Sequence, residues 1–242
     1  MEESEGVFRK LGLPGFITAM DAVHMAYDRA PFPARHLFMG KEGYPTVGVN
    51  VHSNAVGWVK HVGSIFPGAH NDKTAVQFDK LVSAMRNDAL FTSCESETSV
   101  PASNGENFKL HGCMALCDSG YHRWRETMCA MKYPTSVNDA RFSSRFRCMR
   151  YSITLRVTFT STHQTLTHGC AHTHVYGRCE SVRKIIERVF GMLKKRFRIL
   201  RLPMLVKDMA EVEDIVKVCC VLHNMCLQVH EYTYIPTRHT HT

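Results

Sequence analysis

The sequence predicts an α/β fold in which a mixed sheet is flanked by helices. Short apolar runs at residues 14–21 and 113–118 have the length of buried strands, and each ends in an aspartate. Two β-branched runs lie between them, and two long amphipathic patterns follow toward the C-terminus. This mixture of strand and helix patterns favours helices packed against the faces of one sheet.

The first expected strand is PGFITAMD, with Asp21 at its C-terminal end. Residues 28–46 are rich in Pro, Gly and charged side chains, and they predict a loop. The β-branched runs at 46–53 and 56–66 are separated by the turn signal SNA, so we expect these runs to form a hairpin.

After a loop at 67–72, the chain predicts one helix with an apolar face made by Val76, Phe78, Leu81, Val82 and Met85. Residues 92–106 are rich in Ser, Thr, Glu and Asn and predict a flexible loop. The run CMALCD predicts a second buried strand that ends at Asp118. If the strands ending at Asp21 and Asp118 are neighbours, their two carboxylates can approach each other.

The clearest helix covers residues 182–200, where apolar residues follow the spacing of one buried stripe. Its members are Val182, Ile185, Ile186, Val189, Phe190, Leu193, Phe197 and Leu200. Glu187 lies on a neighbouring stripe with three cations, Arg183, Lys194 and Arg198. A carboxylate among these cations either forms salt bridges with them or binds a metal ion next to the phosphates of a nucleic acid.

A last helix is expected over about 207–228, with apolar residues facing inward: Met209, Val212, Ile215, Val216, Cys219, Leu222 and Met225. The 242-residue chain has a formal net charge of +8, which favours an anionic partner such as nucleic acid, a membrane surface or an acidic protein. It contains no apolar run of 18 residues, so we expect no membrane-spanning helix.

Three acids on rigid elements suit metal-dependent phosphodiester chemistry, because Mg²⁺ is held by carboxylates, water and substrate phosphates. Two such ions can activate the attacking oxygen and stabilise the leaving oxygen. Basic residues at the end of the predicted helix would neutralise a nucleic-acid backbone. Two plainer interpretations stay open: a strand-end aspartate can cap a turn, and a basic helix can be a solvated face.

Six stretches occur in an order that resembles the PIF/Harbinger group of DDE transposases and the Harbinger-derived nucleases. They are GLPGFITAMDAVH, GKEGYPTVGVNV, FPGAHNDKTAVQFD, LCDSGYHRW, ESVRKIIERVFGMLKKRFRIL and CVLHNM. The resemblance covers roughly residues 7–145 and 180–227. It implies an RNase H-like fold and a nuclease that cuts DNA in the nucleus with two Mg²⁺ or Mn²⁺ ions.

Carried over by motif, the resemblance implies Asp21 as the first catalytic acid and Glu187 as the helical acid. The second acid is Asp118 in CDSGY, where Cys replaces the family's Gly, and Asp72 in HNDK is its rival. All are implied metal ligands. Arg183, Glu187 and Lys194 match the R-x3-E-x6-K pattern of the family's helix. DNA contacts are expected from the basic residues of this helix, Arg183, Lys194, Lys195 and Arg198.

The resemblance predicts an endonuclease domain over 7–228, interrupted at 146–179 by a foreign or disordered insertion and followed by a disordered tail, 229–242. The insertion and the tail have the composition of translated noncoding sequence. Zn²⁺ binding is the alternative for the insertion, since it holds His163, His168, Cys170, His172, His174 and Cys179.

The first acid lies only 20 residues from the start of the chain, so we expect the family's helical DNA-binding region to be missing. The chain is then a truncated or domesticated copy, which can depend on a separate DNA-binding partner protein. The alternative function is a catalytically inactive, transposon-derived protein that keeps the fold and binds nucleic acid or protein.

Overall fold

The computed structural model describes residues 2–11, 13–101, 107–129 and 176–233. Most of the predicted insertion, up to residue 175, lies outside the described residues, as does the predicted tail from residue 234. Helix α6 begins at Tyr176, so it includes the last four residues of the range assigned to the insertion, 176–179. Helix α7 ends at Thr233, within the range assigned to the tail.

The core of the molecule is a five-stranded mixed sheet with the order β3-β2-β1-β6-β7. β1 pairs antiparallel with β2 and parallel with β6, and β6 pairs parallel with β7. The strand bounds are β1 Phe16–Ala26, β2 Thr46–Ser53, β3 Val59–Pro67, β6 Met114–Leu116 and β7 Thr127–Met128. The predicted fold class is confirmed: this is the α/β, RNase H-like arrangement of a mixed sheet flanked by helices.

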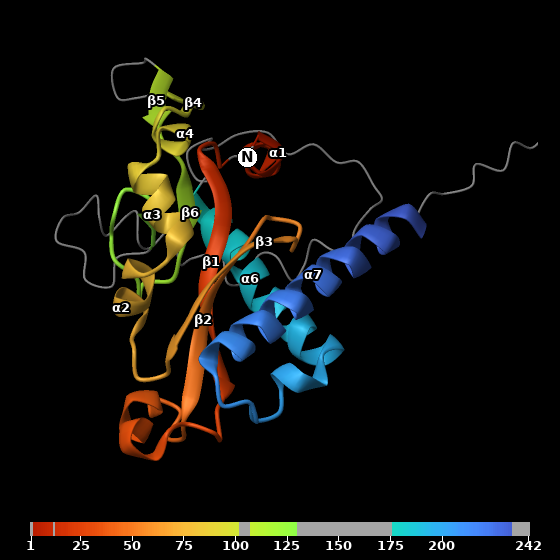
Figure 1. The fold of residues 1–242 in the computed structure, drawn as a ribbon. Coiled ribbons are helices and arrows are strands. Elements are labelled where there is room, and N and C mark those ends of the chain that lie inside the picture. The colour runs from red at the N-terminus through yellow and green to blue at the C-terminus, as the bar shows by residue number, and fades with distance from the viewer. Residues whose placement is uncertain (1, 12, 102–106, 130–175, 234–242) are drawn as a thin grey trace, which may run out of the picture.

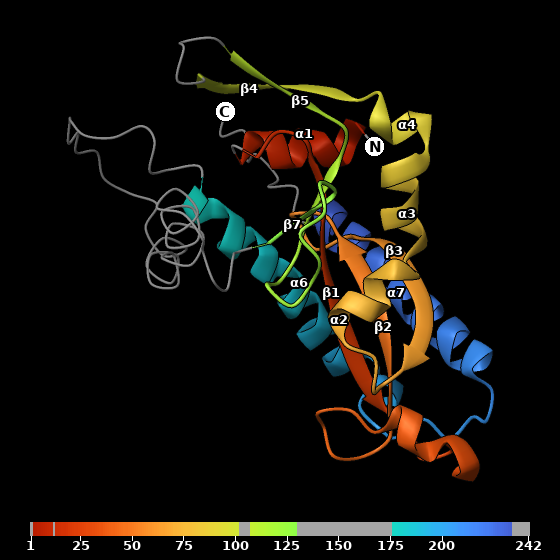
Figure 2. The same ribbon diagram turned by 90° about the vertical axis from the view of Figure 1, so that its left-hand side faces the viewer.

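Helices cover both faces of this sheet (Figure 1). α6 (Tyr176–Arg196) and α7 (Met209–Thr233) lie on one face. α2 (Asp72–Gln77) and α3 (Lys80–Asn87) lie on the other, in front of the sheet in Figure 2. α1 (Glu2–Lys10) packs near the start of β1. Two buried clusters result, one on each face, because successive strand side chains point to opposite sides.

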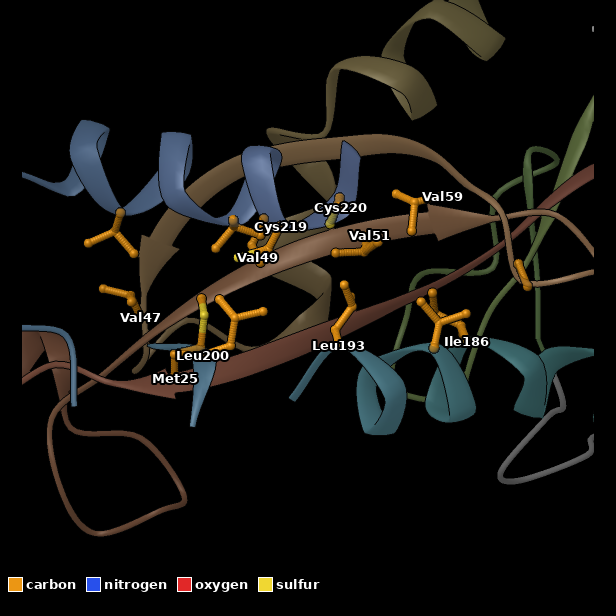
Figure 3. Close-up of a cluster of buried hydrophobic side chains, with 14 of the residues drawn as sticks. Met25, Val47, Val49, Val51, Val59, Ile186, Leu193, Leu200, Cys219 and Cys220 are labelled. Atoms are coloured by element: carbon orange, nitrogen blue, oxygen red, sulfur yellow. The ribbon is translucent and has the colours of Figure 1, made fainter. Parts of the chain in front are cut away.

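The larger cluster fixes α6 and α7 to the central strands. Val47, Val49 and Val51 alternate along β2 and are fully buried. In Figure 3 the side chains from β1 and β2 lie between those of α6, such as Ile186 and Leu193, and those of α7. The apolar stripe predicted over residues 182–200 is confirmed, since its members are buried or partly buried against this cluster. The predicted helix end at residue 200 is wrong, because α6 ends at Arg196 and the last turn of the stripe belongs to the 3-10 helix η4 (Arg198–Leu200).

The first strand is longer than predicted, and Asp21 lies in its middle rather than at its end. Antiparallel pairing with β2 continues from Ala19 to Ala26, which extends the strand through AVHMA. Parallel pairing with β6 stops at the pair Ala19–Leu116. The strand end predicted at Asp21 was therefore wrong, but Asp21 does lie just beyond the parallel part of the sheet.

The single helix predicted after residue 72 is wrong, because the chain forms α2 and α3 with a break at Phe78 and Asp79. The Asp79 carboxylate accepts the N–H groups of Leu81 and Val82, so it caps α3. Its other oxygen accepts a 3.0 Å hydrogen bond from His52 Nε2. Phe78, predicted on the apolar face, is 64% exposed.

Two other sequence expectations also need correction. The predicted flexible loop at 92–106 contains β4 (Glu95–Pro101), which follows the short helix α4 (Ala89–Thr92) and pairs antiparallel with β5 (Asn107–His111). Its Ser- and Glu-rich composition lacks the apolar alternation that signals a strand. The loop predicted at 28–46 contains a 3-10 helix, η1 (Phe32–Phe38).

The C-terminal half of α7 departs from the predicted inward face. Val212, Val216 and Cys219 are buried as predicted, but Leu222 and Met225 are 42% and 55% exposed. Polar residues take the inward positions there. Asn224 hydrogen-bonds both the N–H and the carbonyl of Val59, and so binds α7 to the edge of β3. The end of α7 projects away from the sheet in Figure 1.

The buried His52–Asp79 pair gives a prediction about stability. Burial alone would raise the pKa of Asp79, but the charge and hydrogen bond of His52 outweigh it and lower that pKa to about 2. Asp79→Ala removes both the pair and the cap, so we expect it to cost roughly 3–5 kcal/mol in urea unfolding at pH 7. Asp79→Asn keeps a capping oxygen and is expected to cost less.

The sign of the pH dependence follows from the lowered pKa. The stabilising contribution of Asp79 is fully present above the unfolded value of 3.8 and is lost as pH falls toward about 2. An Asp79→Ala variant within about 1 kcal/mol of the wild type at pH 7 would contradict this account of the pair.

Candidate active site

Asp21 occupies a position that disfavours its own negative charge. Its side chain is 23% exposed. Burial is the largest cause that raises its pKa to about 6. The N–H of Ala22 and the charge of Arg183 act in the opposite sense, while the carboxylates of Asp118 and Asp72 raise the pKa further. The site therefore gathers acids around a poorly solvated carboxyl group.

A buried arginine connects Asp21 to Glu187. The guanidinium of Arg183 donates a 2.9 Å hydrogen bond to Glu187 Oε1 one turn along α6, and it lies 4.0 Å from Asp21 Oδ2 on β1. The Arg183 side chain is only 7% exposed, whereas that of Glu187 is 49% exposed. Glu187 thus forms an ion pair within its helix, as one of the two sequence interpretations expected, and still faces solvent beside Asp21.

Asp118 lies near Asp21 because β6, the strand before Asp118, pairs in parallel with β1, the strand that contains Asp21. Because Ala19 pairs with Leu116, each aspartate stands two residues beyond the last pair of adjacent parallel strands. Asp118 is exposed and lies two residues after the end of β6 at Leu116. Its charge is close enough to raise the pKa of Asp21, so the structure brings together these two predicted site residues.

Asp72, the rival second acid, also reaches this region. It is the first residue of α2 and is half-buried. A Cβ atom added to Gly120 would lie 2.4 Å from Asp72 Oδ2, so the carboxylate rests against the backbone of the DSGY loop. Burial raises the pKa of Asp72, Lys41 lowers it and Asp118 raises it. Both candidates for the second acid therefore surround Asp21.

Two neutral residues that the sequence reasoning did not select lie beside the acids. Tyr121 is 1% exposed, and its hydroxyl donates to Asn50 Oδ1 at 3.3 Å. Burial, followed by the charges of Asp21 and Asp72, raises the pKa of Tyr121 well above its usual value. Tyr121 therefore stays neutral. The sequence signal for Tyr121 was its place in the CDSGY motif. Asn50 is recognised only from the structure, where it pairs opposite Ala22.

The four cations predicted to bind DNA fall into two groups. Arg183 binds the acids, and Lys194 donates to the carbonyl of His24 on β1 at 3.1 Å. Both connect α6 to the central strand. Lys195 and Arg198 are exposed. The neighbouring His24 side chain lies near Thr46 Oγ1, and burial, then Lys41, lowers its pKa.

The acids have the chemistry of a hard-metal site, because Mg²⁺ and Mn²⁺ prefer carboxylate oxygens. The raised pKa of Asp21 and the buried cation beside it indicate a place where positive charge is favourable. Within the described part of the chain, no three His, Cys, Asp or Glu side chains form a group that could hold a metal ion as they stand. The zinc alternative at residues 163–179 concerns side chains outside the described ones.

Comparison with protein families decides the identity of this domain. The family described as DDE superfamily endonuclease matches residues 20–224, a range that contains all four acids. The chain belongs to the DDE endonuclease superfamily. Members of this superfamily are transposase-like nucleases that act on DNA and generally use divalent metal ions. No curated protein and no solved structure matches the chain.

Among the helices that the structure describes, none has the length and apolar character required to cross a bilayer.

The unfavourable position of Asp21 yields a prediction that separates a functional acid from a structural ion pair. Its folded pKa of about 6 exceeds the unfolded value of 3.8, so ionisation destabilises the metal-free fold as pH rises through this range. We expect Asp21→Asn to raise the unfolding free energy at pH 7.5 by an amount on the order of 1–3 kcal/mol.

Thermal unfolding in EDTA measures this effect. The gain should vanish near pH 4, where Asp21 is protonated in the folded wild type. The exposed Asp28→Asn serves as a matched control and should change little. If Asp21→Asn were less stable than wild type at pH 7.5, Asp21 would be a structural partner of Arg183 instead.

Proposed function

We propose that this DDE domain is of the PIF/Harbinger type and cleaves DNA phosphodiester bonds, with Asp21, Asp118 and Glu187 as its catalytic metal ligands. The observation that carries the proposal is the setting of Asp21, whose pKa is raised by the charge of Asp118 and which lies beside the guanidinium that pairs with Glu187. Asp21 and Asp118 stand at equivalent positions beyond a parallel strand pair. Glu187 is linked to Asp21 by the Arg183 guanidinium.

The strand register supports a shared site for the two aspartates. Residues at equivalent positions on neighbouring strands lie about 4.8 Å apart and point to the same face of a sheet. Asp21 and Asp118 each follow the Ala19–Leu116 pair by two residues, which supports a shared site, and the effect of Asp118 on the pKa of Asp21 agrees with this.

In this proposal Mg²⁺ or Mn²⁺ is held by Asp21, Asp118 and Glu187, with Asp72 as an additional acid. When bound, two such ions activate the attacking oxygen and stabilise the leaving oxygen of a phosphodiester. Glu187 can turn toward the aspartates because its side chain is half-exposed. Arg183 then remains beside Asp21, and Tyr121, whose pKa is well above its usual value, stays a neutral hydrogen-bonding neighbour.

The DNA substrate and its setting are part of the same proposal. Lys195 of α6 and Arg198, which follows this helix, are exposed and would neutralise phosphates, in line with the net charge of +8. Action on nuclear DNA, together with a separate DNA-binding partner protein, follows from the resemblance to Harbinger proteins.

A second candidate function is a catalytically inactive derivative that binds nucleic acid or protein. One observation favours it specifically. Glu187 is already satisfied by Arg183 at 2.9 Å, and no three-ligand group is formed among the described side chains.

Nicking of supercoiled plasmid in Mn²⁺ tests the proposal. We expect metal-dependent conversion to open circles, and Asp21→Asn or Glu187→Gln should reduce its rate at least about 100-fold. Asp214→Asn, an exposed acid on α7, is the matched control and should retain the wild-type rate. Circular dichroism checks that each variant is folded. Cleavage without metal, or equal rates in the acid variants, would reject the nuclease in favour of the inactive derivative.

The same assay separates Asp118 from Asp72. We expect Asp118→Asn to match the loss of Asp21→Asn, because these residues share the strand register. Asp72→Asn should lose roughly tenfold, since that residue acts on the site through its charge and its contact with Gly120. The reverse order of the two losses would make Asp72 the second catalytic acid.

A further inference from the structure

A groove of about 510 Å³ lies along α6 on the flank opposite the acids. Its other wall is the turn between β2 and β3. Val56, Ile185 and Met192 supply apolar surface, while Arg188 and Lys195 supply two cations. The described residues that line it include no Asp or Glu. The groove is therefore amphipathic and electropositive.

The turn that forms the second wall is held in place by several hydrogen bonds. Asn54 Oδ1 accepts from the N–H groups of Val56 and Trp58. Gly57 adopts a positive φ of 90°, and its carbonyl accepts from the buried His223 Nε2 of α7. His223 Nδ1 in turn accepts from Arg196 of α6. This wall is fixed before any ligand arrives.

Gly191 lies in the interior of α6 and lines the same groove. A glycine there costs roughly 1 kcal/mol relative to alanine. A Cβ atom at this position would meet no described residue within 4 Å, so packing within the described part of the chain gives no reason for the glycine. Close approach of another molecule does give one. Gly191 stands one turn beyond Glu187 and one turn before Lys195, on the exposed surface between the acids and the groove.

The two cations are placed for a polyanion. Arg188 and Lys195 are seven residues apart, so they lie two turns apart on one side of the helix. Both are exposed, and neither has a carboxylate partner within ion-pair distance among the described residues. In contrast, Arg183 and Lys194 on the catalytic flank bind groups of the protein itself.

We propose that the groove binds the sugar–phosphate backbone of a DNA strand that continues from the acids across α6 at Gly191. Arg188 and Lys195 pair with phosphates, and the apolar surface of Val56 and Met192 contacts the sugars. The strand passes closest to the helix at Gly191, where no side chain stands in its way. This inference rests on the proposed function, since it takes DNA as the substrate of the neighbouring site.

The first test measures binding in EDTA, where no cleavage occurs. Fluorescence anisotropy follows a labelled 20-base-pair duplex, chosen as roughly two helical turns, at several salt concentrations. The double variant Arg188→Gln/Lys195→Gln should bind about tenfold more weakly near 0.1 M salt, and the slope of log K against log salt should fall by about 2. The matched control Lys80→Gln/Lys207→Gln removes two exposed cations outside the groove and should keep the slope within about 0.5 of wild type.

The second test replaces Gly191. A glycine with only a structural role would give the opposite result, a loss of stability without a loss of DNA binding. Gly191→Ala and Gly191→Leu should raise the melting temperature of the protein, since each is a better helix former. Both should weaken DNA binding, and leucine should do so more than alanine. Wild-type affinity in the double-cation variant and in Gly191→Leu would overturn the inference.

The two proposals fail separately in these experiments. If acid variants nick DNA as well as wild type while groove variants lose affinity, the groove stands and the nuclease assignment falls. If nicking requires the acids but groove variants bind normally, only the groove inference falls. Binding of polyglutamate that depends on Arg188 and Lys195, with DNA binding unaffected by them, would show a peptide groove and also overturn the inference.

Discussion

The guanidinium of Arg183 is the interaction on which the candidate site depends. It is nearly inaccessible to solvent, and it joins the middle of β1 to the exposed edge of α6 through Asp21 and Glu187. Without a cation there, two partly desolvated carboxylates would repel each other across the seam between sheet and helix. The charge of Arg183 therefore pairs with a carboxylate on β1 and with one on α6. Structure and proposed chemistry therefore share one electrostatic requirement, an excess of positive charge at this seam.

α6 serves two surfaces because its sides differ in chemistry. Its core-facing stripe, with Ile186 and Leu193, is buried against β1 and β2. One flank carries Arg183 and Glu187 toward the strand acids. The other carries Arg188 and Lys195 along the groove beside the β2–β3 turn. In the proposed path, a DNA strand that meets the acids crosses this helix at Gly191, which has no side chain. In this proposal the helix connects cleavage to substrate binding.

Much of this arrangement could be predicted from residue patterns. The buried stripe of α6 and the β2–β3 hairpin are strongly periodic, and both were found where expected. Predictions failed where a tertiary contact overrides local pattern. The predicted helix is broken at Asp79. Its carboxylate caps α3 and also accepts a hydrogen bond from His52, a residue distant in sequence. Asp21 lies within a strand because β2 pairs beyond the point where β6 stops. Neither the His52–Asp79 hydrogen bond nor the longer pairing of β1 with β2 can be predicted from the residues adjacent in sequence.

The site residues also divide into those that the sequence predicted and those that only the fold reveals. Asp21, Asp118, Asp72 and Glu187 were identified through motifs, and Asp118 and Asp72 act electrostatically on Asp21 in the fold. The partners of these acids were not predictable. The pairing of Lys194 with the His24 carbonyl and the contact of Asp72 with Gly120 depend on distances that only the fold sets. Two of the four basic residues that the resemblance assigned to DNA, Arg183 and Lys194, bind groups of the protein itself.

The central claim is that Asp21, Asp118 and Glu187 form one site for divalent metal. Electron paramagnetic resonance of Mn²⁺ titrated into the folded protein tests it most directly, because it reports both the number of bound ions and their magnetic coupling. The account predicts two coupled Mn²⁺ ions per chain, and loss of the coupled signal in Asp21→Asn. Absence of bound Mn²⁺ at millimolar concentration, or binding unchanged by Asp21→Asn, would contradict it.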